Sequence, residues 1–403
     1  MSKTSIIIDA GPGELRGALV RAGAVWDVVH HRDSDPSLIG AIYRGRVRRV
    51  DHGLDGAFVD IGTGAEAYMR ARDASDSDAK MPRNVRIGER VNEGAQIDVR
   101  VVADGFAEKG PRVARVTPDP AYKGRPVPAC LETPPSPVAL ILTRLAGTDP
   151  DRIVCGGGAI EKAARQWAAE NAPVLDARIS RGSGDLFATH EIEDAIEAAL
   201  ARRVRITGGA ELVFDTTEAM CVIDINSAGT LGRSRRLGRD VNLKAVPEIA
   251  RQLRLRNIAG AVVIDALKMG ARDDRNRVLS ALRSVLKDDP GTCHVLGITN
   301  LGLIEMTRTR TGLSLADRML APAPAASLSP DAAAYAALRA VLRAAAATPS
   351  SGYRLLVAPN VAAALAGRLS GAREQAAQAV GPVDIVAESG RANDRFEIVL
   401  GSY

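Results

Sequence analysis

The chain has 403 residues, of which 46% are hydrophobic, 25% are charged and 3% are aromatic, and its formal net charge is +5. These values are those of an ordinary soluble protein with room for two to four compact units. No apolar run approaches the roughly 18 residues of a membrane span, which excludes a membrane-spanning helix, whereas the mildly basic charge permits a polyanionic partner.

The cysteines and the N-terminal residues allow a prediction of the cellular compartment. Four cysteines are scattered along the chain without the spacing of a zinc site, at positions 130, 155, 221 and 293. We expect them to be buried free thiols in a reducing compartment. Residues 1–8 carry no secretory pattern, so we expect a cytoplasmic enzyme.

Short strands dominate the first third of the chain. Residues 5–9, 17–20 and 25–29 are predicted to form an antiparallel meander. Residues 36–115 carry many short strands broken by Gly and Asp, which favours a small closed barrel of the OB type. One strand there places Arg44, Arg46 and Arg48 on alternate positions, so one face is basic. The alternative is an edge strand that its charges protect from pairing.

The middle of the chain mixes strands and helices. Residues 138–142 are predicted to be a strand and residues 159–171 a helix. Residues 189–203 are predicted to form an amphipathic helix with Thr189 as the N-cap and Ile192 and Ile196 on its apolar face.

Alternating strands and helices follow, which predicts an α/β layer. The strands are residues 211–215, 219–225 and 261–265, and a helix carries an apolar stripe over 278–286. Another helix is predicted to begin near Pro247, because proline suits a first turn. Its apolar residues would face inward, and three arginines would face mostly outward: Arg251, Arg254 and Arg256.

Two further segments complete the organisation. The loop before the Pro247 helix carries four arginines that either follow a nucleic-acid backbone or are simply solvated: Arg233, Arg235, Arg236 and Arg239. Residues 321–330 are typical of a linker, and the remainder is predicted to be a small α/β unit.

Two apolar strands each end on an aspartate, Asp224 and Asp265. A carboxylate at the end of a buried strand is costly to desolvate unless a positive group meets it. Neighbouring strands would bring both carboxylates to one sheet edge and form a hard-oxygen site suited to Mg²⁺ or Mn²⁺. The alternative is that each aspartate caps a following turn or helix.

Five runs of sequence, in order, resemble the catalytic half of the ribonuclease E/G family. They are FATHEIE (187–193), EAMCVIDINSA (218–228), EIARQLRLR (248–256), VID (263–265) and GLIEMTR (302–308). Two earlier runs, IYRGRV (42–47) and AFVDIG (57–62), resemble the OB-fold embedded in that family. The resemblance covers most of residues 1–318.

The resemblance implies a multidomain α/β fold. It consists of an RNase H-like subdomain (1–35 and 160–215) with an inserted OB-fold (36–115) and a shortened 5′-sensor-like segment (116–159), then a DNase I-like catalytic subdomain (216–320) and a small α/β domain (331–403).

The implied activity is Mg²⁺-dependent cleavage of single-stranded RNA to 5′-phosphate and 3′-hydroxyl ends, in RNA processing or decay. By this likeness Asp224 and Asp265 hold the metal, Mn²⁺ being a second candidate, and Asn226 orients the site by a hydrogen bond. On spacing alone, Asn226 is as well explained as a turn former after its strand.

Four further positions match RNA contacts of the family. Phe58 and Tyr68 correspond to aromatics that stack on RNA, Lys109 to a lysine that meets the backbone, and Arg144 to a clamp for a 5′-phosphate. Two of them have a structural alternative: Phe58 as a barrel-core residue, and Lys109 as a solvated loop charge.

The chain departs from the family pattern at several places. Residues 319–324 lack the cysteines of the family's zinc link, so no structural zinc is expected, and a homodimer, if one forms, must use other surfaces. Leu145 cannot donate the hydroxyl hydrogen bond of the family's 5′ pocket, so we expect weak or absent dependence on the 5′ end. Lys268 adds positive charge near the metal, and Asn300 stands where an RNA contact is common.

Two other functions stay open at this point. One is a non-catalytic RNA-binding relative that kept the fold and lost turnover. The other is a phosphodiesterase that acts on DNA. The intact pair of strand-end aspartates favours the endoribonuclease.

Overall fold

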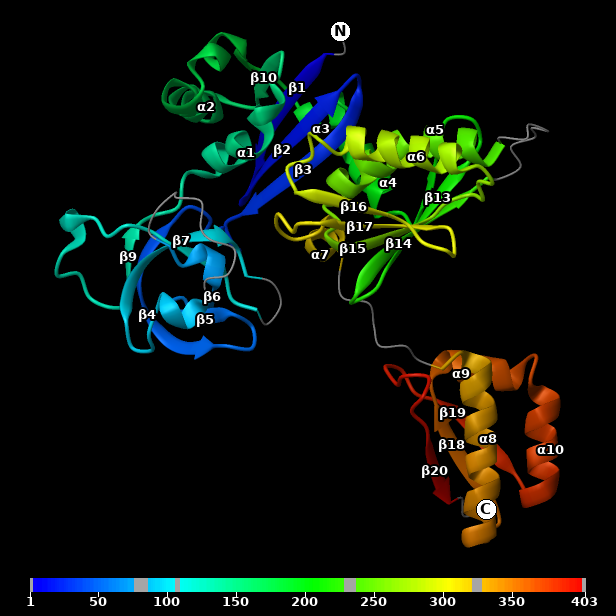
Figure 1. The fold of residues 1–403 in the computed structure, drawn as a ribbon. Helices are drawn as coiled ribbons and strands as arrows, with labels where there is room; N and C mark the ends of the chain where they lie inside the picture. Colours follow the sequence, from blue (N-terminus) through cyan, green and yellow to red (C-terminus); the bar gives the residue numbers. More distant parts are fainter. Residues whose placement is uncertain (1–2, 76–85, 106–108, 228–236, 321–327, 401–403) are drawn as a thin grey trace. The chain divides into compact units, whose positions relative to one another are not determined.

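The structure is a computed structural model that describes residues 3–75, 86–105, 109–227, 237–320 and 328–400. The chain divides into two compact units, Met1–Leu320 and Ala321–Tyr403. Figure 1 shows the order of the elements along the chain. In the described part of the chain, no helix is both long and apolar enough to cross a membrane.

The first sheet is mixed and has strand order β11-β10-β1-β2-β3. The antiparallel meander predicted from the sequence is present as β1 to β3, while β10 runs parallel to β1 and β11 parallel to β10. Helices α1 and α2 pack on one face, and α3 and α4 on the other. The strands and helices are β1 (Thr4–Gly11), β2 (Glu14–Arg21), β3 (Ala24–Arg32), β10 (Arg152–Cys155), β11 (Ile179–Arg181), α1 (Pro137–Leu145), α2 (Gly158–Asn171), α3 (Leu186–Thr189) and α4 (Ile192–Leu200). An RNase H-like identity for this layer stays a prediction.

The second sheet closes on itself as a five-stranded barrel, as predicted. Its order is β5-β6-β8-β7-β4, β4 also pairs with β5, and β9 extends the sheet beside β4. Small and β-branched residues such as Ala57, Val59 and Val99 fill its interior. The strands are β4 (Ile42–Asp51), β5 (Gly56–Asp60), β6 (Ala67–Arg70), β7 (Gln96–Ala103), β8 (Arg112–Arg115) and β9 (Ala129–Glu132). The architecture is therefore a mixed α/β chain with an OB-like barrel.

The third sheet has order β12-β13-β14-β15-β17-β16. Strands β14 and β15 are parallel, and the other neighbouring pairs are antiparallel. Helices α5 and α6 cover one face. The elements are β12 (Arg203–Arg205), β13 (Glu211–Thr216), β14 (Met220–Asn226), β15 (Gly260–Asp265), β16 (Cys293–Ile298), β17 (Leu303–Arg308), α5 (Leu237–Leu255) and α6 (Arg272–Val285).

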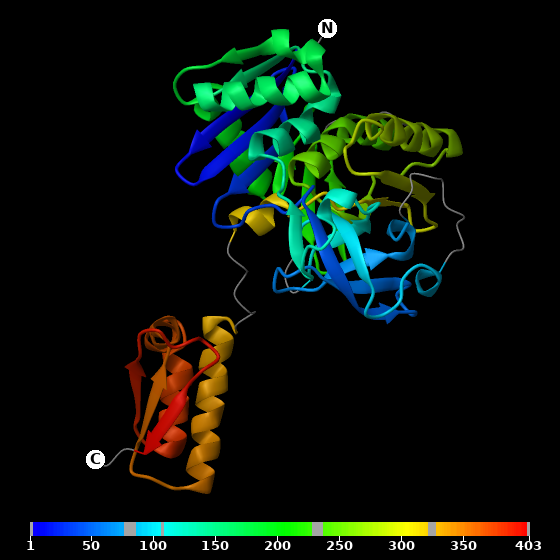
Figure 2. The ribbon, with the colours of Figure 1, turned by 90° about the vertical axis from the view of Figure 1, so that its left-hand side faces the viewer.

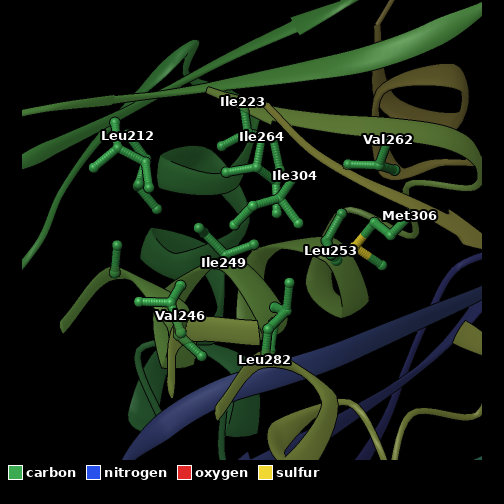
Figure 3. Packing of buried hydrophobic residues seen from close by; sticks show 14 of the residues in the cluster. Leu212, Ile223, Val246, Ile249, Leu253, Val262, Ile264, Leu282, Ile304 and Met306 are labelled. Carbon is green, nitrogen blue, oxygen red and sulfur yellow. The ribbon is translucent and has the colours of Figure 1, made fainter. Parts of the chain in front are cut away.

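Alternation along these strands decides which face is buried. Ile223 and Ile225 on β14 and Ile264 on β15 point toward the helices and are almost fully buried. Figure 3 shows residues of this cluster meeting residues of α5 and α6, including Val246, Ile249, Leu253 and Leu282. The residues between them, among them Asp224 and Asp265, therefore lie on the opposite face of the sheet.

The C-terminal unit is a three-stranded sheet of order β19-β18-β20 with helices on one face. Figure 2 shows the long helix α8 alongside this sheet. The predicted small α/β unit is present. Its elements are α8 (Pro330–Ala347), β18 (Tyr353–Val357), α9 (Pro359–Ala366), α10 (Ser370–Val380), β19 (Val383–Ala387) and β20 (Glu397–Leu400). Helix α7 (Leu315–Met319) ends the first unit, which also holds short 3₁₀ turns at Ala71–Asp73, Ile87–Glu89, Pro120–Tyr122, Ala146–Thr148 and Pro173–Arg178.

The predicted strand at residues 138–142 is wrong, because this segment lies within helix α1. Ser136 caps the helix by accepting a hydrogen bond from the backbone N–H of Ala139, and Pro137 occupies its first position. A short apolar run does not distinguish a buried strand from a buried helix, and the cap decides the outcome here.

Two helix boundaries also differ from the prediction. Helix α5 includes Pro247 as an interior residue and already contains Leu237. Pro247 is exposed, so its ring lies on the side of the helix that faces water. Thr189 ends α3 instead of capping the next helix, because Glu191 takes a left-handed conformation (φ 54°) between α3 and α4. The predicted apolar face of α4 is confirmed, with Ile192 and Ile196 buried.

The prediction that Arg251, Arg254 and Arg256 face mostly outward is wrong for two of the three. Arg254 is 3% exposed and Arg256 is 9% exposed. The guanidinium of Arg254 donates to Asp27 on β3, and that of Arg256 lies over the ring of Phe214 and donates to Gln252. These partners lie mostly far away in sequence, and they offset the cost of burying a cation.

Candidate functional site

The two aspartates that follow the apolar runs are direct neighbours in the sheet. Asp224 on β14 is the register partner of Asp265 on β15. Because the two strands are parallel and about 4.8 Å apart, both side chains stand side by side at the carboxyl edge of the sheet. Asp224 is half-buried and Asp265 is exposed, so the pair is open to solvent.

Asn226 belongs to the same face, two residues beyond Asp224. Its Nδ2 donates a hydrogen bond to Asp224 Oδ2 at 2.7 Å. This contact orients the Asp224 carboxylate through one of its two oxygens. Asn226 is the last residue of β14, so its side chain supports the aspartate from within the strand.

A buried asparagine that sequence reasoning missed supports the other aspartate. Asn242 on α5 is fully buried, its Nδ2 donates to the carbonyl of Leu267 at 2.8 Å, and its Oδ1 accepts from the N–H of Leu267 at 3.0 Å. Leu267 lies two residues after Asp265. This paired contact ties the loop behind Asp265 to the helix under the sheet. The sequence feature that could have identified Asn242 is its position next to Val241, on the buried side of an amphipathic helix, where a polar amide needs hydrogen-bond partners.

The donor set at this edge fits a hard divalent cation. In the described residues, no group of three or more His, Cys, Asp or Glu side chains could hold a metal ion. A cation at this edge would therefore take the two carboxylates from the protein and keep water or substrate oxygens as its other ligands. Mg²⁺ is bound in this way, through one or two carboxylates together with substrate phosphates. Lys268 is exposed beyond the pair.

A row of aromatic and basic residues crosses the barrel surface. The registers pair Arg49 with Phe58, Phe58 with Tyr68, and Tyr68 with Arg112 on four successive strands. The rings of Phe58 and Tyr68 lie 5.4 Å apart at 52°, and the Arg49 guanidinium lies 4.4 Å from the Phe58 ring centre. Both rings are half-buried, and Phe58 lies outside the barrel core, where its neighbours Ala57 and Val59 point.

Other predicted barrel contacts have distinct surroundings. Lys109 is exposed just before β8. Of the alternating arginines on β4, Arg44 is largely buried against Asp98 through two hydrogen bonds of 2.8 and 2.9 Å. Arg48 is exposed and pairs with Asp60, so part of this basic face is already neutralised.

Arg144 lies in a buried ion-pair cluster. Its Nη2 donates to Asp27 Oδ1 at 3.0 Å, and its Nη1 donates to the carbonyl and hydroxyl of Thr311. Asp27 is fully buried and also binds Arg254. These contacts give Arg144 a structural role, and its role as a phosphate clamp stays a prediction. Leu145 beside it is fully buried.

The predicted basic loop falls mainly outside the described residues, which leave out Arg233, Arg235 and Arg236. Arg239 is described and belongs to α5, where it pairs with Asp240 and with Asp274 of α6. It is therefore a helix residue held by two carboxylates.

Comparison of the sequence with known proteins identifies similar ribonucleases. The sequence model of the Ribonuclease E/G family matches residues 117–311. Ribonuclease G of Salmonella typhimurium (strain SL1344) is 27% identical over 98% of this chain and 99% of that protein, and Ribonuclease G of Escherichia coli (strain K12) is 26% identical over the same shares. Ribonuclease E of Escherichia coli (strain K12) is 33% identical over 49% of this chain and 19% of that protein.

Proposed function

This chain belongs to the ribonuclease E/G family, and on that premise we propose that it is an endoribonuclease that cuts single-stranded RNA at the edge formed by Asp224 and Asp265. The observation that carries the proposal is the direct pairing of these two residues in adjacent parallel strands. The match to Ribonuclease G over nearly the whole length supports the same activity.

Asp224 and Asp265 would hold Mg²⁺ or Mn²⁺. When bound, such an ion lowers the pKa of a coordinated water and offsets the charge that builds on a phosphate under attack. The chain's own residues prepare the site. Asn226 orients the Asp224 carboxylate, and Asn242 holds the backbone behind Asp265. Expected products carry a 5′-phosphate and a 3′-hydroxyl.

The barrel row supports selectivity for unpaired RNA. Half-exposed rings at Phe58 and Tyr68 offer faces on which bases can stack, which contributes about 1–3 kcal/mol per base. A base inside a duplex cannot use such a surface. Arg49 and Arg112 at the ends of the row add positive charge for the backbone, and the exposed Lys109 adds a further contact.

The surroundings of Arg144 support low sensitivity to the 5′ end. Its guanidinium is committed to Asp27 and Thr311, so a terminal phosphate would have to compete with a buried carboxylate. Leu145 offers no hydroxyl. A cytoplasmic location and a homodimer that does not depend on zinc stay predictions.

Cleavage of a fluorogenic single-stranded RNA tests the proposal. We expect cleavage in Mg²⁺, loss of cleavage in excess chelator, and loss of at least about 100-fold in Asp224→Asn and Asp265→Asn, because each removes a carboxylate from a two-carboxylate site. Asp384→Asn, a half-exposed strand carboxylate in the C-terminal unit, is the matched control and should cleave normally. Equal rates in all four proteins would contradict the metal-site assignment.

Two further substrates separate the open alternatives. Binding of RNA without cleavage under any metal condition would identify a non-catalytic relative. Preference for a DNA strand of the same sequence would identify a DNA phosphodiesterase instead.

A further inference from the structure

Two exposed arginines stand beside the aspartate pair on the open face of the third sheet. Arg202 donates to Asp215 through Nε at 2.6 Å and Nη2 at 2.7 Å. Arg203 donates through Nη1 to Glu211 at 2.5 Å. Both arginine side chains are more than half exposed.

Strand register places both pairs next to Asp224. Val213 is the direct partner of Asp224 and also of Arg203. Since directly paired residues share a face, Arg203 lies on the same face as Asp224, with the buried side chain of Val213 between them. Asp215 and Glu211 lie two residues to either side of Val213, and they hold the two guanidiniums on the β13 side of the aspartate pair.

Arg202 keeps hydrogen-bonding capacity beyond its ion pair. Its two bonds to Asp215 use Nε and Nη2, and across the described residues Nη1 has no partner. The hydrogen bond to Asp215 raises the pKa of Arg202, and the nearby charge of Asp224 contributes to the same shift. A planar guanidinium that a carboxylate holds on one side can still present its other edge to a phosphate.

The simplest alternative is a solvated surface ion pair without further role. The C-terminal unit contains such a pair in a similar setting, Arg354 with Asp384 on neighbouring strands. Side-chain exposures are 60% and 48% there and 56% and 49% for Arg202 and Asp215. The two pairs differ in their neighbours. Arg202 and Arg203 lie beside the proposed cleavage site, where a bound RNA strand would bring a backbone phosphate close to their guanidiniums.

We propose that Arg202 and Arg203 form a subsite for a backbone phosphate of the RNA strand, next to the phosphate at the aspartate pair. This inference rests on the proposed function, because it assumes that single-stranded RNA is the substrate. Beyond the proposed function, the subsite defines a path for the RNA strand, which would pass over β12 and β13.

The salt dependence of RNA binding tests the subsite. The full-length Asp224→Asn protein provides a non-cleaving parent, and the variants in it are Arg202→Gln, Arg203→Gln, the double variant and the control Arg354→Gln. For single-stranded RNA, the slope of log K against log salt should fall by about 0.7 for each arginine that no longer neutralises a phosphate, and by about 1.4 in the double variant. Arg202→Lys should keep the slope, because it keeps the charge.

The control sets the outcome that overturns the inference. Arg354→Gln should bind RNA with the parent slope. If the double variant shows the slope of Arg354→Gln, or if the parent does not bind RNA, the subsite does not exist. Cleavage by the unsubstituted protein is measured in parallel. A reduced slope in the double variant without cleavage by the unsubstituted protein would retain the subsite and reject the proposed catalysis.

Discussion

Replacement of Asp27 should unfold the first sheet at markedly lower denaturant. Asp27 is fully buried and accepts hydrogen bonds from Arg144 and Arg254, each at 3.0 Å. Asp27→Asn keeps the side-chain volume but removes the charge, and it leaves two guanidiniums without their shared counter-charge.

The expected cost follows from the burial of the three residues. Breaking a buried ion pair by removing one partner costs about 3–5 kcal/mol, because the other charge stays uncompensated. The Arg254 side chain is 3% exposed, whereas the Arg144 side chain is 18% exposed and keeps some hydration. We therefore expect the free energy of unfolding to fall by about 3 kcal/mol, at the low end of this range. That is a large share of the roughly 5–15 kcal/mol that stabilises a typical domain.

Urea denaturation followed by tryptophan fluorescence measures this loss. The chain has two tryptophans, and both Trp26 and Trp167 belong to the cluster that packs on the first sheet. With a urea m-value of about 3 kcal/mol per molar, the midpoint should fall by about 1 M. A midpoint within about 0.2 M of the parent would refute the account of Asp27 as the centre of a buried network.

Arg144→Met gives the second arm of the experiment. We expect it to lower the urea midpoint while leaving the ratio of cleavage of 5′-monophosphorylated to 5′-hydroxyl RNA unchanged. An unchanged midpoint together with a loss of preference for the phosphorylated RNA would instead identify Arg144 as the phosphate clamp.

Three other outcomes follow from buried groups. Asn242→Leu removes both bonds to Leu267 and should weaken Mn²⁺ binding and cleavage by about 10-fold or more, with an unchanged far-ultraviolet circular dichroism spectrum; unchanged Mn²⁺ affinity would contradict its positioning role. Burial lowers the pKa of His30 below its ordinary 6.5, against the opposing effect of Glu14. His30 therefore binds a proton more readily in the unfolded chain than in the folded protein. The free energy of unfolding should fall as the pH drops below about 6.5, the pKa of the unfolded side chain. In urea titrations at several pH values, His30→Gln should make this fall smaller. Burial raises the pKa of the Cys155 thiol to about 11, so at pH 7.5 iodoacetamide should modify the exposed Cys130 and leave Cys155 intact, as peptide mass spectrometry can check.

The strand patterns predicted where the two aspartates lie in the sheet. Runs of β-branched residues that end on Asp224 and Asp265 allow few structures other than buried strands, and period-two alternation decides the face of each side chain. The sequence does not show that β14 and β15 are neighbours. The three-dimensional structure shows this, and it makes Asp224 and Asp265 direct partners. The same holds for the row of Phe58 and Tyr68 on the barrel.

The failures share a physical cause, which is that the deciding contact lies elsewhere in the chain. Arg254 is buried because Asp27 lies opposite it, 227 residues away in sequence. Helix α5 passes through Pro247 because residues before it, such as Val241 and Ala245, pack into the core under the sheet. The expectation of buried thiols failed at Cys130, which is exposed on the short strand β9.

Binding of Mn²⁺, followed by electron paramagnetic resonance, tests most directly whether the two carboxylates act together. The account predicts that the unsubstituted protein and Asp384→Asn bind one Mn²⁺ each and that Asp224→Asn and Asp265→Asn both lose it. A bound ion of unchanged affinity in either aspartate variant would contradict a shared site at the edge of β14 and β15.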